Sequence, residues 1–237
     1  MSILPSALLN LRAFFKQFAL QQPCVLCGAM SAQGLCCHPC AAELPYLRGS
    51  LCAQCSAPIS NGNMCGHCLA HPPIFTRCTA AFSYTFPINQ LIQQFKYQEQ
   101  LALLPLLAAP LLAKISRDDL PDVIIAMPLH RHKLQHRTYN QSLLIAQYLA
   151  HKLHIELWTH ACERVVDTVS QSTLPFNQRG KNMRNAFVCH VDLSGKKVAL
   201  VDDVLTSGAS LNALARAVQQ QGASEIQSWV VARTIRQ

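Results

Sequence analysis

The sequence predicts an α/β protein in which a parallel β-sheet is flanked by helices and preceded by a small cysteine-rich segment. After about residue 78, short apolar runs alternate with amphipathic helical stretches, a pattern typical of a parallel sheet covered on both faces. Ahead of it, four Cys-x-x-Cys pairs fall within 45 residues. The 237 residues are 50% hydrophobic and 14% charged, enough to build a sizeable core. We therefore expect three parts, which are 1–22, 23–78 and 79–237.

The first part, 1–22, is expected to form an amphipathic helix. Arg12 and Lys16 interrupt its apolar stretch and no basic region precedes it, so it is not a typical secretory signal. The apolar face of this helix would pack on the rest of the protein, or alternatively on a partner or a membrane surface. The apolar run at 101–113 contains two prolines and is too short to span a membrane. Without an export signal, we expect the chain in the reducing cytosol, where disulfides are rare.

The cysteine-rich segment consists of two copies of one unit, PCVLCGAMSAQGLCCHPC and LCAQCSAPISNGNMCGHC, offset by 28 positions. In each copy, nine residues separate two Cys-x-x-Cys turns. Two such turns supply the four thiolates of a structural zinc site, with no open position for catalysis. A redox dithiol or a disulfide framework is the alternative, and the pairs could join within a copy or across copies. The prediction is two structural zinc ions, held by Cys24, Cys27, Cys37, Cys40, Cys52, Cys55, Cys65 and Cys68.

The third part alternates strands with helices. Apolar runs predict strands at 80–86, 122–127, 154–158, 197–203 and 225–233. Helical periodicity predicts helices from 88 to about 117, with a break at Pro105 or Pro110, from 138 to 152, and from 209 to about 221. Ligands of such sheets bind outside the carboxyl ends of the strands. The loops after 122–127 and after 197–203 are therefore the expected binding site.

The stretch VALVDDVLTSGAS at 198–210 carries the most specific chemistry. Its strand runs into Asp202 and Asp203, whose carboxylates can accept hydrogen bonds from two neighbouring sugar hydroxyls. The loop that follows offers an anion backbone N–H groups, hydroxyls and the positive end of a helix. Ribose 5-phosphate has such a diol and such an anion, whereas the simpler alternative makes the acids a turn signal. The loop residues are Thr206, Ser207, Gly208, Ala209 and Ser210.

This stretch resembles the phosphoribosyl diphosphate (PRPP) binding motif of type I phosphoribosyltransferases. The resemblance implies that Asp202 and Asp203 hold the ribose hydroxyls at the catalytic centre, that the loop 206–210 holds the 5′-phosphate, and that Mg²⁺ accompanies PRPP. In the purine-salvage members an acid that handles the base occupies the position of Thr206. Since threonine cannot do so at neutral pH, purine salvage is a less favoured activity, and the acceptor is left open.

More of the chain resembles the ComF family of competence proteins. The cysteine-rich segment, the sequences around Tyr84 and Lys96, and MPLHRHKLQHRTYNQ at 127–141 carry this resemblance. The sequence departs from the family pattern at Thr138, where the family usually has a glycine. Further matches are Arg164, Gln171, Leu174, Arg179 and NMRNAF at 182–187.

Positive charge is concentrated in one part of the chain. The net charge is +8, and between His130 and Asn185 eight Lys/Arg face three Asp/Glu. Such a surface suits phosphorylated or nucleic-acid partners, or is simply a solvated face. We expect His130, Arg131 and Arg137 to meet the diphosphate of PRPP. The stretch 163–185 is expected to form a cover loop or a nucleic-acid contact through Arg164, Gln171, Arg179 and Arg184.

The resemblance implies a PRPP-binding protein that serves DNA uptake and natural transformation in the cytosol. One hypothesis is a phosphoribosyltransferase of unspecified acceptor. A second is a regulatory protein that binds PRPP or a nucleotide without turnover. A third is a non-catalytic factor that handles single-stranded DNA, alone or alongside other competence proteins.

Overall fold

The computed structural model describes residues 22–32, 34–131, 137–166 and 185–235. Nearly all of the predicted helix 1–22 lies outside these residues. The chain divides into two compact units, Met1–Leu44 and Pro45–Gln237, each of which is described by itself. The boundaries expected after residues 22 and 78 stay predictions.

The first unit contains the first cysteine repeat. Strand β1, Gln22–Pro23, pairs antiparallel with β2, Met30–Ser31, and the short helix α2 spans His38–Ala42. Cys24 and Cys27 lie in the turn between the two strands, while Cys37 is the N-cap residue of α2 and Cys40 lies inside it. The strand pair and the helix thus bring both Cys-x-x-Cys turns of this repeat together.

The second cysteine repeat belongs to the second unit. Helix α3, Gly66–Ala70, begins after its N-cap residue Cys65. Three cysteines of this repeat, Cys52, Cys55 and Cys68, are buried in one hydrophobic cluster with Phe75 and with strands of the main sheet. This repeat is therefore part of the domain core rather than an appendage to it.

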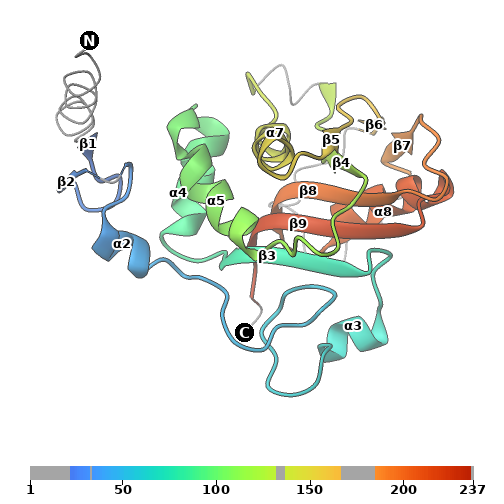
Figure 1. The fold of residues 1–237 in the computed structure, drawn as a ribbon, viewed down its shortest axis with the longest axis horizontal. Helices are drawn as coiled ribbons and strands as arrows, with labels where there is room; N and C mark the ends of the chain where they lie inside the picture. The colour runs from blue at the N-terminus through green and yellow to red at the C-terminus, as the bar shows by residue number, and fades with distance from the viewer. Residues whose placement is uncertain (1–21, 33, 132–136, 167–184, 236–237) are drawn as a thin grey trace, which may run out of the picture. The chain divides into compact units, whose positions relative to one another are not determined.

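A five-stranded parallel sheet forms the centre of the second unit, in the order β3-β9-β8-β4-β5 (Figure 1). The predicted fold class is confirmed. The longest strands lie in the middle, where both faces are buried, as in other parallel sheets. The bounds are β3 Arg77–Ser83, β4 Val123–Ala126, β5 Glu156–Leu157, β8 Lys197–Leu205 and β9 Glu225–Arg233.

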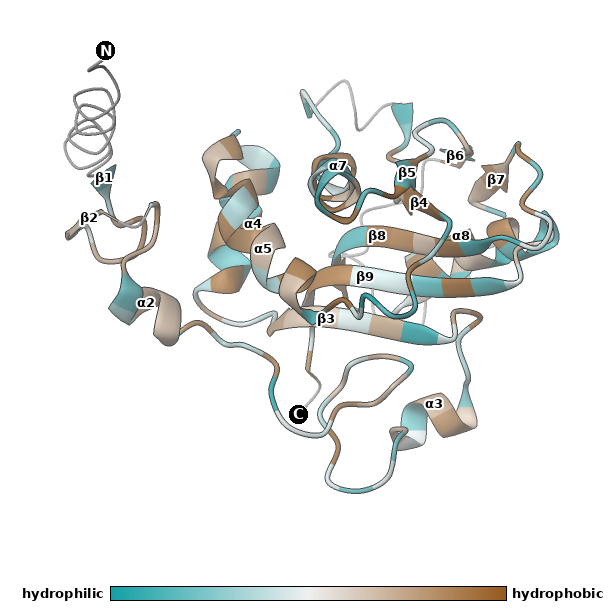
Figure 2. Cartoon of the chain, in the orientation of Figure 1, coloured by the Kyte–Doolittle hydropathy of each residue, from teal (hydrophilic) through white to brown (hydrophobic). Residues whose placement is uncertain are grey.

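Helices cover both faces of this sheet. Helices α5, Leu104–Lys114, and α7, Gln141–Leu153, pack together on one face (Figure 1). Helix α5 is hydrophobic over most of its length, whereas α4, Ile88–Tyr97, alternates hydrophobic and hydrophilic residues (Figure 2). On the other face, α8, Ala209–Gln220, packs on alternate residues of β8, since side chains of a strand point to opposite faces in turn.

Several element boundaries differ from the prediction. The first strand lies three residues earlier than 80–86, and the helical break falls at the 3₁₀ turn Leu101–Leu103, before Pro105. Pro105 then occupies the first turn of α5, where its missing N–H is not needed, and Pro110 lies inside the helix. A short antiparallel hairpin was not predicted at all. It consists of β6, Cys162–Arg164, and β7, Phe187–Cys189.

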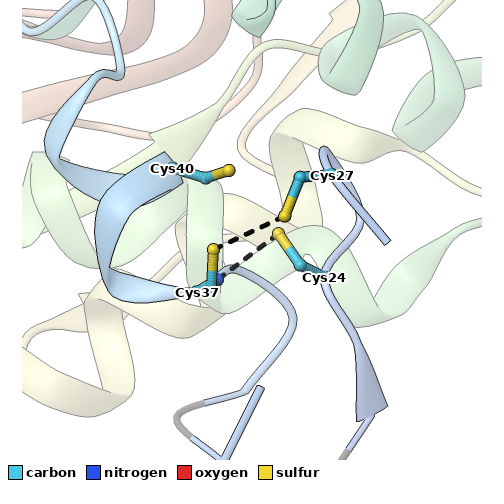
Figure 3. A group of neighbouring side chains, drawn as sticks. All are labelled: Cys24, Cys27, Cys37 and Cys40. Atoms are coloured by element: carbon cyan, nitrogen blue, oxygen red, sulfur yellow. Dashed lines mark hydrogen bonds between the residues drawn. The ribbon is translucent and has the colours of Figure 1, made fainter. Parts of the chain in front are cut away.

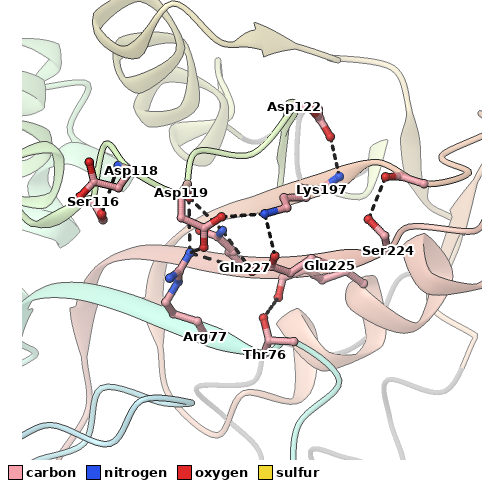
Figure 4. A network of polar contacts seen from close by, with 12 residues as sticks. Thr76, Arg77, Ser116, Asp118, Asp119, Asp122, Lys197, Ser224, Glu225 and Gln227 are labelled. Carbon is pink, nitrogen blue, oxygen red and sulfur yellow. Dashed lines mark hydrogen bonds and ion pairs between the residues drawn. The ribbon is translucent and has the colours of Figure 1, made fainter.

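A network of ion pairs closes the amino edge of the sheet (Figure 4). Asp119 accepts hydrogen bonds from Lys197 at 2.8 Å and from Arg77 at 2.7 Å, and Glu225 lies 3.4 Å from Lys197. The hydrogen bonds from Lys197 and Arg77 lower the pKa of the Asp119 carboxyl. These charges pair with one another at the amino edge, and their side chains are partly exposed to solvent. The opposite, carboxyl edge is different.

Candidate functional site

A cavity of about 520 Å³ lies at the carboxyl edge of the sheet. Helix α4, strand β8 and the loop that leads into α8 contribute most of its wall. The chemistry-bearing side chains and loop residues that line it are Lys96, Tyr97, Arg137, Arg164, Asp202, Asp203, Thr206, Gly208 and Ser210.

The two acids line this cavity, near the end of β8. Lys96 Nζ lies 2.5 Å from Asp203 Oδ2, and Ser142 Oγ donates to Asp202 Oδ1 at 2.8 Å. The backbone N–H of Asp203 also donates to Asp202 Oδ1, at 2.9 Å. Asp202 Oδ2 and Asp203 Oδ1 accept no hydrogen bond from the residues that the structure describes. Each acid thus keeps one oxygen available for a ligand hydroxyl.

Burial and the neighbouring charges change the pKa values of Asp202 and Lys96. Burial, followed by the charge of Asp203, raises the pKa of Asp202 to about 7, although Lys96 and the Ser142 hydroxyl act against the rise. Burial acts to lower the pKa of Lys96, but the neighbouring Asp203 outweighs burial and raises it. The charged form of Lys96 is therefore favoured, whereas burial favours the protonated form of Asp202. A ligand that donates hydrogen bonds to these oxygens would stabilise the fully ionised form.

The loop 206–210 connects the acids to helix α8. Gly208 is the N-cap residue of this 12-residue helix and has a φ of 81°, a left-handed conformation that favours glycine. A Cβ there would meet only Leu205 Cδ1, at 3.5 Å, so the backbone conformation and not lack of space selects glycine. Ser207 and Ala209 line a neighbouring cavity beside α3. Helix α8 begins directly after this turn, at Ala209.

The predicted basic residues occupy different positions. Arg137 and Arg164 line the cavity: Arg137 Nη2 donates to the Tyr97 hydroxyl at 2.6 Å, and Arg164 is buried over the ring of Phe187. Arg131 does not line it and pairs with Glu163 at 3.8 Å, with its side chain 77% exposed. His130, which follows strand β4 in the chain, is buried. Gln171, Arg179 and Arg184 lie outside the described residues.

Sequence reasoning assigned no role to three residues that shape the site. Lys96 enters the sequence prediction only through the family resemblance of the residues around it, and Ser142 does not enter it. Asn140 accepts hydrogen bonds from the backbone N–H groups of Ser142 and Leu143, which caps α7, and donates to the Met127 carbonyl at 2.9 Å. It thereby ties the start of α7 to the end of β4. The N-cap preference of asparagine was a usable signal for this residue.

Each cysteine repeat gathers its own set of four thiols. The sulfur atoms of each set lie within 4.8 Å of one another, with 3.7 Å between Cys27 and Cys37 (Figure 3) and 3.6 Å between Cys55 and Cys65. Zinc bonds of about 2.3 Å in a tetrahedron require sulfur separations of about 3.8 Å. Both sets fit structural zinc, and the pairs join within a repeat, not across repeats.

Comparisons with known proteins agree with this architecture. The family model "Double zinc ribbon domain" matches residues 16–69, and "Phosphoribosyl transferase domain" matches residues 141–237. DNA utilization protein YhgH of Salmonella typhimurium is 33% identical over 222 residues, 90% of this chain and 97% of that protein. Competence protein F of Haemophilus influenzae is 33% identical over 220 residues, covering 83% and 96%. Competence protein ComFC of Bacillus subtilis is 22% identical over 212 residues, covering 84% of each.

In the described ranges, no helix has both the length and the apolar character that crossing a bilayer requires.

Proposed function

The chain belongs to the family of competence protein F and DNA utilization protein YhgH, and on that premise we propose that its carboxyl-edge cavity binds PRPP or a related phosphoribosyl compound. The observation that carries the proposal is that the acid pair lines one cavity together with Thr206, Gly208 and Ser210 of the anion loop. Asp202 Oδ2 and Asp203 Oδ1 would accept hydrogen bonds from the two ribose hydroxyls. The N–H groups and hydroxyls of 206–210 would hold the 5′-phosphate at the start of α8.

Cations around the acids suit the rest of the ligand. Lys96, Arg137 and Arg164 line the same cavity as the acids and bring positive charge toward a diphosphate. Mg²⁺ bound together with PRPP would add charge neutralisation on the same group. We propose that Arg131 and His130 contribute from the neighbouring loop. The roles of Gln171, Arg179 and Arg184 as cover or nucleic-acid contacts belong to the same proposal.

The arrangement also suits one kind of reaction. When PRPP loses diphosphate, positive charge develops at the anomeric carbon of the ribose. Fixed carboxylates in a partly buried cavity stabilise such charge more strongly than water does. Transfer of the phosphoribosyl group to an acceptor is therefore the activity that this cavity supports best. The two zinc ions would be structural, because all four ligands of each come from the protein.

A panel of small ligands tests the binding mode through the melting temperature, because a ligand that binds only the folded state stabilises it. Ribose 5-phosphate is expected to raise the melting temperature more than ribose or inorganic phosphate at the same concentration. The proposal requires both the diol and the phosphate. An equal response to phosphate and to ribose 5-phosphate would remove the role of the acids.

A second candidate function is the handling of single-stranded DNA, which the names of the relatives favour. Tyr97 and Arg137 both line the cavity, the guanidinium of Arg137 lies 4.5 Å from the ring centre of Tyr97, and Tyr97 is 63% exposed. An exposed aromatic ring beside a cation is a stacking platform for a nucleobase. We propose that the protein acts in the cytosol during DNA uptake, with single strands and other competence proteins as partners. Its charge of +8 suits this role.

A further inference from the structure

Arg233, the last residue of β9, is a buried cation that has no carboxylate partner among the described residues. Only 7% of the residue is exposed, and it forms no ion pair with any residue in the described part of the chain. Its guanidinium instead donates to four backbone carbonyls. They are those of Cys55 (from Nε, 2.9 Å) and of Leu205, Thr206 and Thr234 (from Nη1, 3.1, 2.6 and 2.7 Å).

These carbonyls belong to two different functional parts. Cys55 supplies a thiol of the second cysteine set, whereas Leu205 and Thr206 lead directly into the anion loop. The guanidinium is planar and rigid, so its Nε and Nη1 donors fix the separation of the two segments. The sheet supports this arrangement, because Leu205 is paired with Arg233 and the Thr234 N–H donates to the Leu205 carbonyl. Arg233 thus ties one end of the loop to the ribbon.

The other end of the loop is tied to the same ribbon. Asn212, in the first turn of α8, accepts a hydrogen bond through Oδ1 from the backbone N–H of Ile74 at 2.7 Å. Ile74 follows α3 and precedes Phe75, which packs in the core with the second cysteine set. The segment 206–210 is therefore held on both sides by contacts to the second ribbon.

Charge gives Arg233 a second reason to lie there. Four thiolates around Zn²⁺ carry a net charge of −2, which is costly to bury without a compensating cation. The second set is the more buried of the two, since Cys52, Cys55 and Cys68 are all buried. Arg233 is the cation that reaches this set, because its Nε donates to the backbone carbonyl of Cys55. In the first set, by contrast, Cys27 is exposed to solvent.

We propose that Arg233 is a positioning residue that couples the second zinc centre to the anion loop. Its charge stabilises the zinc thiolates, and its fork of donors holds the Leu205 and Thr206 carbonyls so that the loop presents its N–H groups to a phosphate. Loss of zinc from the second set then loosens the loop, whereas loss from the first set does not. The ligand-binding part of this inference rests on the proposed function.

Three variants separate charge from geometry. Arg233→Gln removes both the charge and the planar fork. Zinc should then transfer from the second cysteine set to a competing chelator about tenfold faster than in wild type. Ribose 5-phosphate should bind at least tenfold more weakly. Arg233→Lys keeps the charge but loses the planar fork, so zinc retention should stay near wild type while ribose 5-phosphate binding still weakens. Arg216→Gln, at an exposed position on α8, is the matched control and should change neither. Wild-type zinc retention and affinity in Arg233→Gln would overturn the proposal.

Hydrogen–deuterium exchange tests the coupling without a phosphoribosyl ligand. Cys65→Ser removes a ligand of the second set and Cys37→Ser one of the first. The amides of 206–210 should exchange about tenfold faster in Cys65→Ser than in wild type, and at the wild-type rate in Cys37→Ser. The amides of α5 should stay protected in both variants. Unchanged loop exchange in Cys65→Ser, or a uniform rise that includes α5, would contradict the coupling. If wild type fails to bind ribose 5-phosphate, the proposed function fails, while the exchange experiment still decides the coupling.

Discussion

Lys96 and Asp203 form an ion pair of 2.5 Å that joins helix α4 to the end of strand β8. Their side chains are 18% and 7% exposed, so the pair is largely shielded from water. The contact holds one carboxylate oxygen of Asp203, Oδ2, against Lys96 Nζ. It also defines which oxygen of the acid remains for a ligand.

Replacing Lys96 with methionine is expected to destabilise the protein by about 3 kcal/mol, because it leaves Asp203 buried and unpaired. Urea unfolding would measure the loss. Lys152→Met, at an exposed position near the end of α7, serves as the control and should change stability by less than about 0.5 kcal/mol. The double variant Lys96→Met, Asp203→Asn should recover part of the loss. A Lys96→Met protein as stable as wild type would show that the pair is not energetically coupled.

Asp202→Asn is expected to stabilise the protein at neutral and higher pH. The pKa of Asp202 is raised from its usual value of 3.8 to about 7, so the folded state holds a proton that the unfolded state has lost between these values. The contribution of this group to stability therefore falls as pH rises from about 4 to 7, and asparagine removes that fall. The melting temperature of Asp202→Asn should exceed that of wild type by an amount that grows between about pH 4 and pH 7. Each 1 kcal/mol of added stability corresponds to about 2–4 °C. A difference that does not vary with pH would refute the raised pKa.

The two cysteine sets predict two zinc ions per chain, measurable by elemental analysis of protein purified without added metal. Cys24→Ser should lose one ion and leave the melting of the α/β domain unchanged. Cys55→Ser should also lose one ion but lower the domain's melting temperature, because this cysteine packs in the same core as the sheet. Equal effects of the two substitutions on the domain would contradict the packing described here.

Binding of single-stranded DNA should depend steeply on salt if phosphates meet the basic residues near the cavity. Each phosphate contact contributes a slope of about 0.7 in log affinity against log salt. Arg137→Ala should reduce the slope by about this amount, and Arg117→Ala, exposed after α5, should not. PRPP with Mg²⁺ should compete with the strand, because Arg137 lines the same cavity. If binding does not depend on salt and PRPP does not displace the strand, single-stranded DNA does not bind at this cavity.

The sheet was predictable because its strands are continuous apolar runs. The strand 225–233 was predicted with the bounds it has, and the parallel arrangement followed from the alternation with helices. The sequence misplaced the strand at 77–83 because the aromatic residues after Ser83 suggested that it continued. It missed the hairpin of β6 and β7, since its strands have only three residues each. Short strands depend on their partners rather than on a pattern of their own.

The candidate site was predictable only where its residues are close in sequence. The acids and the loop 206–210 form one motif, whereas Lys96 and Ser142 reach Asp203 and Asp202 only through the folded arrangement of α4 and α7. Likewise, cysteine spacing predicted the two metal sets but not that the second would join the domain core. The link through Arg233 depends on backbone carbonyls, which leave no signature in the side-chain sequence.

The proposed function depends above all on the acid pair holding the ribose of a phosphoribosyl ligand, and calorimetric titration with PRPP and Mg²⁺ is the decisive experiment. The expected result is saturable binding of one PRPP per wild-type chain, and at least a hundredfold loss in the double variant Asp202→Asn, Asp203→Asn. Asp118→Asn, an exposed acid near the amino edge, should bind as wild type does. Unfolding curves would establish that the double variant is folded. No binding to wild type, or equal binding to the folded double variant, would contradict this role of the acids.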